Sequence, residues 1–452
     1  MISMLLSAAA AAIGARLHGE DVVFSGCSTD SRSLSAGALF IALRGERYDG
    51  HDFVAAARER GASAALVDEE GTETGSLPLL IVPDTRTAMG RLAAHWRAGF
   101  DLPLIALTGS NGKTTVKEMI AAILSQQAPV LATRGNLNND IGVPLTLFGL
   151  GAEHRYAVME MGANHPGEID YLSRLARPTV ALITQCAPAH LEGFGSVEGV
   201  ARAKAEIFNG LMEHGTAVIN ADDDYGGFWS DAASAYRCIS FGLGGDADIS
   251  AVDLRFDTDS GRQSFVLLTP DGNIEVSLAL PGRHNVMNAL AAAACCSAVG
   301  IPPAAIRDGL QHMAAIDGRL QMKRTQRGMR VFDDTYNANP ASLKAGLDVM
   351  AGYPGRHSLV LGDMGELGSQ APDLHRQAGE LAHAEAVQKL YAIGELSRHA
   401  VQAFGAGARH FTDADELVRA MKAELDPSCT VLVKGSRAMG MEKIVQRLVE
   451  EA

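Results

Sequence analysis

Short apolar runs alternate with helix-like segments along most of this chain. In residues 85–315 each run is followed by a stretch whose apolar residues recur every three or four positions, which is the period of a helix. Strands that are buried on both faces are apolar throughout, so this alternation predicts a mainly parallel sheet covered by helices. The strands are expected at Leu104–Leu107, Val130–Ala132, Tyr156–Glu160, Val180–Ile183 and Ala217–Ile219.

The pattern changes before this region and once inside it. Residues 1–84 mix helices such as His51–Arg60 with short strands, which are expected at Leu39–Leu43, Ala64–Val67 and Leu79–Val82. Between Asp248 and Leu280, apolar and polar residues alternate around the turn sequences TDSG (258–261) and PDGN (270–273). This predicts an antiparallel meander, and the alanine-rich stretch Asn285–Ala298 that follows predicts a helix.

Residues 316–452 show a third pattern, a regular alternation of strands and helices. Strands are expected at Val331–Asp333, Leu359–Gly362, Lys389–Ala392 and Val431–Val433, with helices near 341–351, 373–386, 414–425 and 439–451. This predicts a doubly wound α/β domain. Its sequence LGDMGELG (361–368) is one residue away from the glycine spacing of a dinucleotide site, so we expect a tight strand-to-helix loop rather than an NAD site. We therefore divide the chain into domains 1–84, 85–315 and 316–452.

The N-terminal sequence MISMLLSAAAAAIGARL has two interpretations. As a signal peptide it has the apolar stretch, but no Lys or Arg precedes that stretch. As the first helix of the fold it would place Ile2, Leu5, Leu6 and Ile13 on the buried side. No run of about 18 strongly apolar residues occurs, so we expect no membrane span.

Composition excludes some partners and favours a compartment. The 452 residues carry a formal net charge of −14 and contain no long run of Lys and Arg, which argues against nucleic acid or an anionic membrane as the main partner. The six cysteines show no C-x-x-C and no metal-ligand spacing. Free thiols in a reducing cytosol are the simplest account.

The sequence TGSNGKTT (108–115) carries the most specific chemistry. It lies between a predicted strand and a predicted helix, so its backbone N–H groups can converge on a phosphate. Lys113 adds a positive charge for the β- and γ-phosphates, and Thr114 occupies the position that usually ligates Mg²⁺. Leu107 stands where the general P-loop has its first glycine, which argues against G proteins and motor ATPases. The alternative is a glycine turn that contains Gly-Lys-Thr by chance.

Three further side chains form a coherent site only together with this loop. Glu160 ends a predicted strand, where a parallel sheet presents side chains to a ligand, but a surface carboxylate is an equal alternative. His190 also follows a strand, although a lone histidine is more often structural. Lys204 lies on a helical pattern and could equally be a solvated helix lysine.

Motifs along nearly the whole chain together resemble the Mur ligase family. They include TGSNGKTT, RGNLNNDIGVPLT (134–146), EMGANHPGEI (160–169), AHLEGFGS (189–196), GRHNVMNALAAAA (282–294), DGRLQ (317–321), DDTYNANPASL (333–343) and VKGSRAMGMEKIV (433–445). Within the family, the chain most resembles the branch that joins D-alanyl-D-alanine to UDP-N-acetylmuramoyl-tripeptide. The signs are the runs GNLNNDIGVP and TYNANP and the absence of the sequence D-N-P-R.

The resemblance implies a fold and a reaction. The fold would have a small α/β N-terminal domain for the UDP-sugar, a central P-loop domain for ATP, and a C-terminal Rossmann-like domain that closes on ATP and binds the dipeptide. The peptide carboxylate would attack the γ-phosphate of ATP to give an acyl phosphate, which the amine of the dipeptide then attacks.

The resemblance also implies roles for individual residues. Thr114 and Glu160 would hold one Mg²⁺, and His190 with a carbamylated Lys204 a second. The ATP contacts would be Gly109, Ser110, Asn111, Gly112, Lys113, Thr114, Thr115, His284, Asn285, Asn288, Arg319 and Asp334. The substrate contacts would be Asp30, Ser31 and Arg32 for UDP, Asn138 and Asn139 for the peptide, and Lys434, Ser436 and Arg437 for the dipeptide. Asp30–Arg32 could equally be a capped turn. For Arg319 the weaker alternative is a solvated arginine.

Two other functions compete with this one. The first is another ATP-dependent amide ligase, either a sister cell-wall enzyme or a folylpolyglutamate synthase, and the second is a nucleotide-dependent switch without catalysis. The switch would not need Glu160, His190 and Lys204 together and would leave residues 1–84 unexplained. We expect a cytoplasmic monomer, and the sequence does not distinguish lysine from diaminopimelate in the tripeptide.

Overall fold

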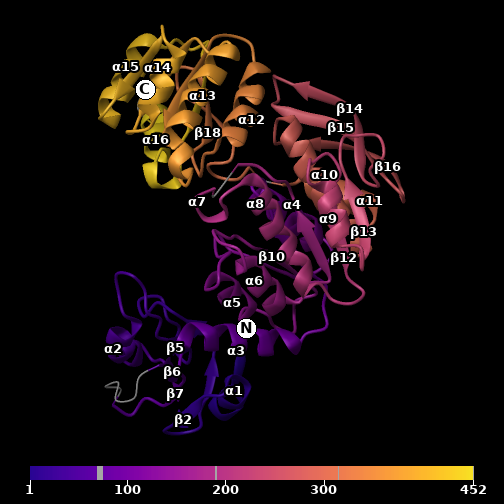
Figure 1. The fold of residues 1–452 in the computed structure, drawn as a ribbon, viewed down its shortest axis with the longest axis vertical. Helices are drawn as coiled ribbons and strands as arrows, with labels where there is room; N and C mark the ends of the chain where they lie inside the picture. The colour runs from indigo at the N-terminus through magenta and orange to yellow at the C-terminus, as the bar shows by residue number, and fades with distance from the viewer. Residues whose placement is uncertain (69–74, 189–190, 314, 451–452) are drawn as a thin grey trace.

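The computed structural model describes residues 1–68, 75–188, 191–313 and 315–450. The chain folds into three α/β domains that follow one another along the molecule in chain order (Figure 1). This confirms the predicted fold class, with a small N-terminal domain, a central parallel-sheet domain that includes an antiparallel meander, and a doubly wound C-terminal domain.

The first domain is built on a five-stranded sheet in the order β2-β7-β6-β5-β4. Its strands are β2 (Arg16–His18), β4 (Cys27–Ser28), β5 (Leu39–Ile41), β6 (Ala64–Val67) and β7 (Leu79–Ile81). Its helices are α1 (Leu6–Ile13), η1 (Gly50–Phe53) and α2 (Val54–Glu59), and β1 (Ser3–Leu5) pairs with β3 (Val23–Ser25) in a separate ribbon. The three predicted strands and the helix over 51–60 are confirmed, and the first turn of that helix is a 3-10 helix.

The N-terminal segment forms a strand before its alanine-rich helix. Ile2, Leu6 and Ile13 are buried as expected, but Leu5 is 45% exposed, so its predicted burial is wrong. The helix begins only at Leu6, and the residues before it are extended. Successive side chains of an extended chain point to opposite faces, so Ile2 points inward and Leu5 outward.

The central domain holds a six-stranded parallel sheet in the order β13-β12-β11-β8-β10-β9. Its strands are β8 (Leu104–Thr108), β9 (Val130–Ala132), β10 (Tyr156–Glu160), β11 (Val180–Ile183), β12 (Thr216–Asn220) and β13 (Arg237–Phe241). Its helices are α3 (Thr85–Ala98), α4 (Lys113–Ser125), α5 (Gly142–Leu147), α6 (Glu168–Ala176), α7 (Leu191–Phe194), α8 (Val197–Ala205), η2 (Glu206–Gly210), α9 (Gly226–Ala232), α10 (Arg283–Ala298) and α11 (Pro303–Gln311).

Alternate residues of the central strands belong to two different cores. On β8, Leu104 and Ala106 pack with α3, α5, α6 and α8, whereas Ile105 and Leu107 pack with α4, α10 and α11. Both faces of the sheet are therefore covered, which is why these strands are apolar throughout. The sequence did not predict β13, an edge strand whose Arg237 and Cys238 are exposed.

The predicted meander is confirmed as β14 (Ser250–Asp257), β15 (Arg262–Thr269) and β16 (Gly272–Leu278). Its inward-facing residues, such as Phe265 and Leu267, join the core beneath α10 and α11. The alanine-rich α10 is buried along most of its length. Small side chains allow it to lie close to α4, which carries the phosphate loop.

The C-terminal domain holds a second six-stranded sheet, in the order β17-β18-β22-β19-β20-β21, in which only β17 is antiparallel to its neighbour. The strands are β17 (Gln321–Arg324), β18 (Arg330–Asp334), β19 (His357–Gly362), β20 (Lys389–Ile393), β21 (Ala408–Phe411) and β22 (Thr430–Lys434). The helices are α12 (Pro340–Ala351), η3 (Gly368–Gln370), α13 (Ala371–Ala384), α14 (Ser397–Phe404), α15 (Ala414–Glu424), η4 (Arg437–Met439) and α16 (Glu442–Glu450).

The predicted elements of this domain are confirmed, and LGDMGELG is indeed the loop between β19 and α13. The sequence missed β17, β21 and α14. The two strands lie at the edges of the sheet and carry few apolar residues, so they give little signal.

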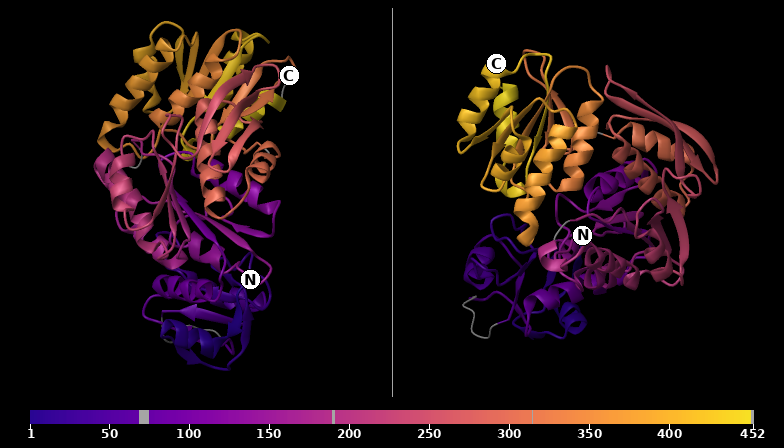
Figure 2. Two further views of the ribbon diagram at one scale, coloured as in Figure 1. Left: turned by 90° about the vertical axis from the view of Figure 1, so that its right-hand side faces the viewer. Right: turned by 45° about the horizontal axis from the view of Figure 1, so that its top comes forward.

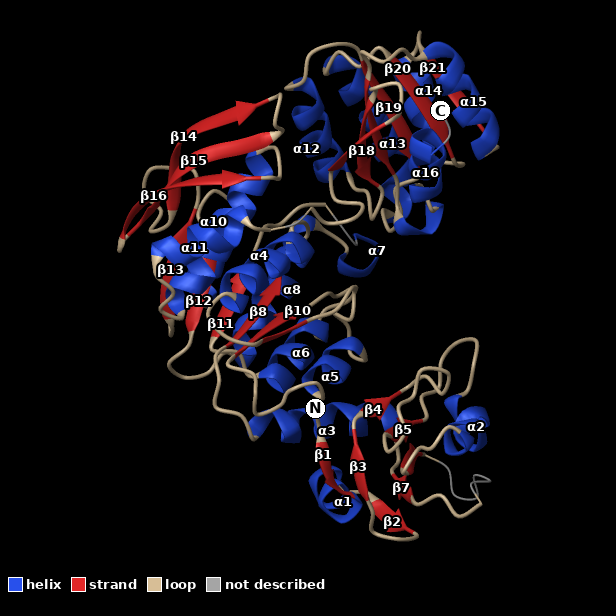
Figure 3. Cartoon of the chain, turned by 180° about the vertical axis from the view of Figure 1, so that it is seen from behind, coloured by secondary structure: helices blue, strands red, loops and turns tan. Residues whose placement is uncertain are grey.

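The first and last domains project from the same side of the central domain (Figures 1 and 3). Helix α3 connects the first two by packing on α5 and α6, and α7 approaches η3 of the C-terminal domain. The three-domain order is also clear in the rotated views of Figure 2. All six cysteines are free thiols, as expected. Among the described residues, no helix combines the length and apolar character needed to cross a bilayer.

Candidate active site

The phosphate-loop sequence follows β8, at the point where the strand order reverses. From β8 the chain crosses first to β9 and β10 on one side of the strand, and then to β11 on the other. Ligands of open α/β sheets bind beyond the carboxyl ends of the strands at such a switch point. The topology therefore places residues 109–115 where the fold is suited to bind a ligand.

Two glycines allow this loop to form. Gly109 and Gly112 have positive φ values of 149° and 80°. A Cβ atom at Gly112 would lie 2.4 Å from Oδ1 of Asn288 on α10. The backbone can thus turn tightly into α4, and the Lys113 ammonium folds back to donate a hydrogen bond to the Gly109 carbonyl at 2.7 Å.

Buried polar atoms without a hydrogen-bond partner gather around the loop. In the part of the chain that the structure describes, they include Thr108 Oγ1, Asn111 Nδ2, Glu160 Oε2 and Arg319 Nε. Buried polar groups nearly always have partners, so each exception calls for an explanation. Together these donors and acceptors fit a polar ligand bound at this site.

Glu160 ends β10, directly beside β8 in the sheet. It is 2% exposed, and its Oε1 accepts a hydrogen bond from Asn138 Nδ2 at 2.8 Å. Its Oε2 has no partner among the described residues. A buried carboxylate oxygen without a partner is costly unless a cation balances its charge. Of Glu160 and Lys204, the two of these predicted side chains that the structure describes, Glu160 lines the cleft.

Lys204 lies on α8 and is 1% exposed, so it is not a solvated helix lysine. Burial lowers the pKa of its ammonium to about 7, and the nearby positive charge of Lys113 acts in the same direction. Its Nζ lies 5.5 Å from the centre of the Phe194 ring on α7. His190 lies outside the described residues, so the structure does not place this predicted ligand.

The helix α10 forms another wall of the site. Asn285 and Asn288 share one helical face, as predicted, and Asn288 Nδ2 donates a hydrogen bond to Asn285 Oδ1 at 3.1 Å. The Asn285 amide also donates to the Pro281 carbonyl at 2.8 Å, so Asn285 orients Asn288 from within the protein. Burial lowers the pKa of His284 to about 4, which keeps its imidazole neutral at physiological pH.

The C-terminal domain contacts the phosphate loop directly. Asn339 Nδ2 donates a hydrogen bond to Asn111 Oδ1 at 2.7 Å, and Arg319 Nη2 donates one to Thr114 Oγ1 at 3.3 Å. The Arg319 guanidinium also lies over the Tyr336 ring, 4.1 Å from its centre. Arg319 is therefore held beside the loop rather than extended into solvent.

Asp334 and Lys434 form a buried ion pair behind this contact. The Lys434 ammonium is 1% exposed and donates hydrogen bonds to Asp334 Oδ2 and to the Asn337 carbonyl. Burial lowers its pKa, and the Asp334 charge opposes that shift. The ammonium predicted to meet the dipeptide is thus directed at Asp334, whereas Arg437 is exposed at the edge of the cleft.

One cleft of about 2100 Å³ joins these walls. The predicted residues that line it are Ser110, Asn111, Gly112, Lys113, Thr114, Thr115, Asn138, Asn139, Glu160, His284, Asn285, Asn288, Arg319, Asp334, Lys434 and Arg437. Gly109, Lys204 and Ser436 are not among the lining residues, although Gly109 and Ser436 are chain neighbours of the lining residues Ser110 and Arg437. All three domains contribute to the lining.

The first domain reaches the cleft through Glu46, and α3 of the central domain adds Arg86 and Thr87; the sequence did not single out these three residues. The predicted contacts Asp30, Ser31 and Arg32 lie outside the lining. Arg32 Nη2 pairs with Asp30 at 2.8 Å, and this hydrogen bonding lowers the pKa of Asp30 to about 2. The pair lies in an exposed turn, which agrees with the alternative interpretation of Asp30–Arg32 as a capped turn.

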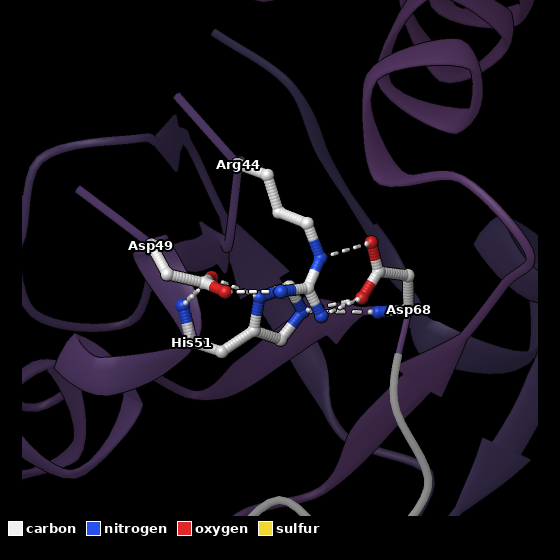
Figure 4. Close-up of polar contacts among 4 residues, drawn as sticks. All are labelled: Arg44, Asp49, His51 and Asp68. Atoms are coloured by element: carbon white, nitrogen blue, oxygen red, sulfur yellow. Dashed lines mark hydrogen bonds and ion pairs between the residues drawn. The ribbon is translucent and has the colours of Figure 1, made fainter. Parts of the chain in front are cut away.

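A polar network holds the loop that carries Glu46 (Figure 4). Arg44 pairs with both Asp49 and Asp68, and its Nη2 lies 2.9 Å from Asp68 Oδ1. His51 lies between the same two residues, with Nδ1 at 2.6 Å from Asp49 Oδ1 and Nε2 accepting the Asp68 N–H at 3.1 Å. In the sequence, the signal that could have identified this loop is the mixture of acidic and basic residues in RGERYDGHDF (44–53).

Comparison with known proteins finds relatives along the whole length of the chain. Three family models match: the Mur ligase family, catalytic domain over residues 23–97, the Mur ligase middle domain over 107–296, and the Mur ligase, glutamate ligase domain over 318–437. The UDP-N-acetylmuramoyl-tripeptide--D-alanyl-D-alanine ligase of Escherichia coli (strain K12) is 45% identical, and the alignment covers 100% of this chain and 99% of that protein.

Solved structures agree with the sequence relatives. A crystal structure of MurF from Acinetobacter baumannii superimposes with a TM-score of 0.94 at 36% identity, covering 100% of both chains. MurF ligase from Thermotoga maritima in complex with ADP has a TM-score of 0.83 at 24% identity, covering 94% of this chain and 97% of the other, and shares the fold.

Proposed function

The chain belongs to the Mur ligase family, and we propose that it joins D-alanyl-D-alanine to UDP-N-acetylmuramoyl-tripeptide, with ATP converted to ADP and phosphate. The observation that carries this proposal is the full-length similarity to ligases named for that reaction, which includes all three domains. A folylpolyglutamate synthase is disfavoured, because the chain also matches the Mur ligase model for the first domain. A switch without catalysis gives no reason for a buried carboxylate in a cleft that all three domains line.

In this proposal residues 1–84 bind the UDP-sugar, 85–315 bind ATP, and 316–452 close on ATP and bind the dipeptide. The loop 109–115 binds the triphosphate with its N–H groups, and Lys113 stabilises the charge that develops on the transferring phosphoryl group. Asn288 and His284 contact the nucleoside from α10, and Arg319 contacts the phosphates from the C-terminal domain. Asn138 orients both Glu160 and the peptide carboxylate, with Asn139 beside it.

A carboxylate must be activated before an amine can attack it, because its negative charge repels nucleophiles. Transfer of the γ-phosphoryl group to the peptide carboxylate forms a carbon–oxygen–phosphorus link and releases ADP. The dipeptide nitrogen then bonds to the carbonyl carbon, phosphate leaves with the former carboxylate oxygen, and the amine loses a proton. The direct contact of Arg319 and Asn339 with the loop encloses this intermediate and limits its hydrolysis by water.

Magnesium fits the residues present. Glu160 Oε2 is a buried anionic oxygen without a partner among the described residues, and Thr114 supplies a hydroxyl oxygen, the hard donors that Mg²⁺ prefers. When bound, the ion would neutralise phosphate charge. For a second ion we propose His190 and a carbamylated Lys204. A buried amine with a pKa of about 7 is to a large extent neutral near pH 7, and the neutral amine is the form that reacts with CO₂. Addition of CO₂ would convert this amine into an anionic oxygen ligand.

The remaining parts of the proposal concern the setting of the enzyme. We propose that it acts in the cytoplasm as a monomer on these small-molecule substrates. Asp30, Ser31 and Arg32 are proposed to contact UDP together with the Glu46 loop, and Ser436 and Arg437 to contact the dipeptide. Lys434 supports the Asp334 side of the nucleotide site.

A direct assay tests this function. Purified protein with ATP, Mg²⁺ and UDP-N-acetylmuramoyl-tripeptide should release phosphate continuously only after D-alanyl-D-alanine is added, and the product should be the pentapeptide by mass spectrometry. Tripeptides that end in lysine and in diaminopimelate should be compared in parallel. Equal turnover with D-glutamate, L-lysine or diaminopimelate as the amine would contradict the assignment.

A further inference from the structure

One charged pair of the cleft has no role in the function described so far. Arg86 on α3 and Asp140, which lies shortly before α5, both line the cleft. Arg86 Nε lies 3.1 Å from Asp140 Oδ2, and the two side chains are 53% and 35% exposed, so a ligand in the cleft can contact both. Helix α3 packs on α5 and α6 where the first domain joins the central domain (Figure 3). A substrate held by the first domain would pass this wall on its way to Glu160.

The wall formed by α3, by residues 136–140 and by residues 161–172 carries little positive charge. In the described parts of these segments, Arg86 is the only lysine or arginine that lines the cleft. The carboxylate of Glu168 on the same wall accepts the backbone N–H groups of Asn164 and His165. Arg86 and Asp140 therefore present a positive and a negative group side by side on a mainly uncharged wall.

Tyr171 on α6 adds a hydroxyl near this pair. It lines the cleft, and a Cβ at Gly90 on α3 would lie 2.0 Å from its Oη. A glycine one helical turn after Arg86 thus leaves room for the hydroxyl. Burial raises the pKa of Tyr171, and the negative charges of Asp140 and Asp84 act in the same direction. The hydroxyl stays protonated and can donate a hydrogen bond to an anionic group.

The pair lies within reach of the point where the peptide would react. Asn138 donates a hydrogen bond to Glu160 Oε1 at 2.8 Å, and Asp140 follows Asn138 by two residues, a stretch of at most about 7 Å. The loop also turns back on itself, since a Cβ at Gly142 would lie 2.3 Å from the carbonyl carbon of Leu137. In the proposed reaction the third peptide residue supplies the carboxylate that is phosphorylated near Glu160. The side chain of that residue begins one carbon from the reacting carboxylate and can extend to Asp140.

We propose that Arg86 and Asp140, with the Tyr171 hydroxyl, bind the end of this side chain and select diaminopimelate over lysine. Diaminopimelate ends in an ammonium and a carboxylate, whereas lysine ends in an ammonium alone. The Arg86 guanidinium and the Tyr171 hydroxyl bind the carboxylate, and Asp140 binds the ammonium, so no charge loses its partner. Lysine would compete with Arg86 for Asp140 and offer Arg86 nothing in return. This inference rests on the proposed function and names its peptide substrate.

The test compares kcat/KM for UDP-N-acetylmuramoyl-tripeptides that end in diaminopimelate and in lysine, at saturating ATP and D-alanyl-D-alanine. The unaltered protein should favour diaminopimelate at least about tenfold, the effect of one charge-assisted contact. Arg86→Met should bring the ratio of the two values close to one. A general loss of stability would lower both values together and leave the ratio unchanged, and an unchanged ratio would overturn the proposal.

Two further variants separate direct contact from charge alone. Arg91→Met is the matched control, because Arg91 is an exposed arginine of the same helix whose charge also acts on Tyr171, but it does not line the cleft. It should keep the ratio of the unaltered protein, and a ratio close to one would overturn the proposal in favour of a long-range charge effect. Asp140→Asn should lower kcat/KM for both tripeptides, since both carry the ammonium. Unchanged values for both would overturn the role of Asp140.

A measurement on the unaltered protein does not depend on how the variants fold. A tripeptide whose diaminopimelate is amidated at the terminal carboxyl keeps the size of the side chain but loses the negative charge, so its kcat/KM should fall to about that of the lysine tripeptide. Equal kcat/KM for all three tripeptides, or a preference for lysine, would overturn the inference and leave the proposed function standing. Absence of turnover with every tripeptide would instead overturn the proposed function itself, and the role of Arg86 with it.

Discussion

Lys204 illustrates how one buried side chain ties chemistry to pH. Burial and the Lys113 charge hold its pKa at about 7, well below the usual value of a lysine. Half of the amine is therefore neutral near pH 7, whereas an exposed lysine would be almost wholly charged. Only the neutral amine adds CO₂, so the local environment sets how readily the proposed carbamate forms.

Activity should accordingly depend on bicarbonate and pH together. At pH 6 the amine is mostly protonated, and at pH 8 mostly neutral, so added bicarbonate should raise turnover at both values and saturate at a lower concentration at pH 8. The measurement is the initial rate in CO₂-depleted buffers. Lys204→Ala should lose at least about a hundredfold in kcat and recover part of it with added short carboxylates. Absence of both effects would contradict the carbamate.

The same residue predicts a trend in stability. Without the carbamate, the unfolded chain binds more protons at this lysine than the folded chain between about pH 7 and its ordinary pKa near 10.4. The contribution of Lys204 to the free energy of unfolding should therefore rise with pH across that window. Lys204→Met, compared with the unaltered protein by denaturant unfolding in CO₂-free buffer, should remove this rise.

At the scale of elements, β8, the glycine loop and α4 form one unit whose shape depends on α10. The backbone of Gly112 is left-handed, and the Asn288 side chain approaches it so closely that a Cβ atom would not fit. The small residues of α10 allow this approach, so a helix from the end of the central domain shapes the loop at its beginning.

Gly112→Ala should therefore abolish detectable ATP affinity and lower the free energy of unfolding by about 1–3 kcal/mol, because both the backbone and the new Cβ are strained. Calorimetric titration and urea unfolding measure the two effects. The matched control is Gly227→Ala in α9, where a Cβ meets nothing within 4 Å and φ is not positive. There alanine should leave ATP binding unchanged and stabilise the helix by up to about 1 kcal/mol. Similar behaviour of the two variants would contradict this account of the loop.

At the scale of the whole molecule, the site exists only because the third domain contacts the second. Arg319 and Asn339 contact the loop from across a domain boundary, more than two hundred residues along the chain. Bound ATP should strengthen this boundary, because it would contact both domains. Any ligand that binds only the folded state stabilises it, by about 2.7 kcal/mol at a concentration one hundred times its Kd.

Arg319→Ala should weaken this coupling while leaving the ligand-free protein almost as stable, since its hydrogen bond to Thr114 is long and only part-buried. The expected result is a smaller rise in Tm with Mg²⁺–ATP, and a kcat reduced by at least about tenfold. The control is Arg398→Ala, which removes an exposed arginine of the same domain that pairs with Glu395 at the surface by a 3.3 Å contact. An unchanged ATP-dependent rise in Tm would contradict the bridging role.

The sequence alone determined the elements and the motif. Apolar runs buried on both faces identified β8 to β12, alternation identified the meander, and the glycines with Lys113 and Thr114 identified the phosphate loop. These features are local, because periodicity and turn chemistry act over a few residues. The edge strands β13, β17 and β21 were missed for the same reason, since an edge needs few apolar residues.

Only the tertiary structure decided which side chains meet. It left Glu160 Oε2 without a partner in the described part of the chain, and it turned Lys434 toward Asp334 and buried Lys204. It also brought Glu46 rather than Asp30 or Arg32 to the cleft. Burial and partners depend on residues that are distant along the chain, and so do the pKa shifts that follow from them. For this protein, the chain's local pattern specifies the parts of the site, and the packing of three domains specifies their chemistry.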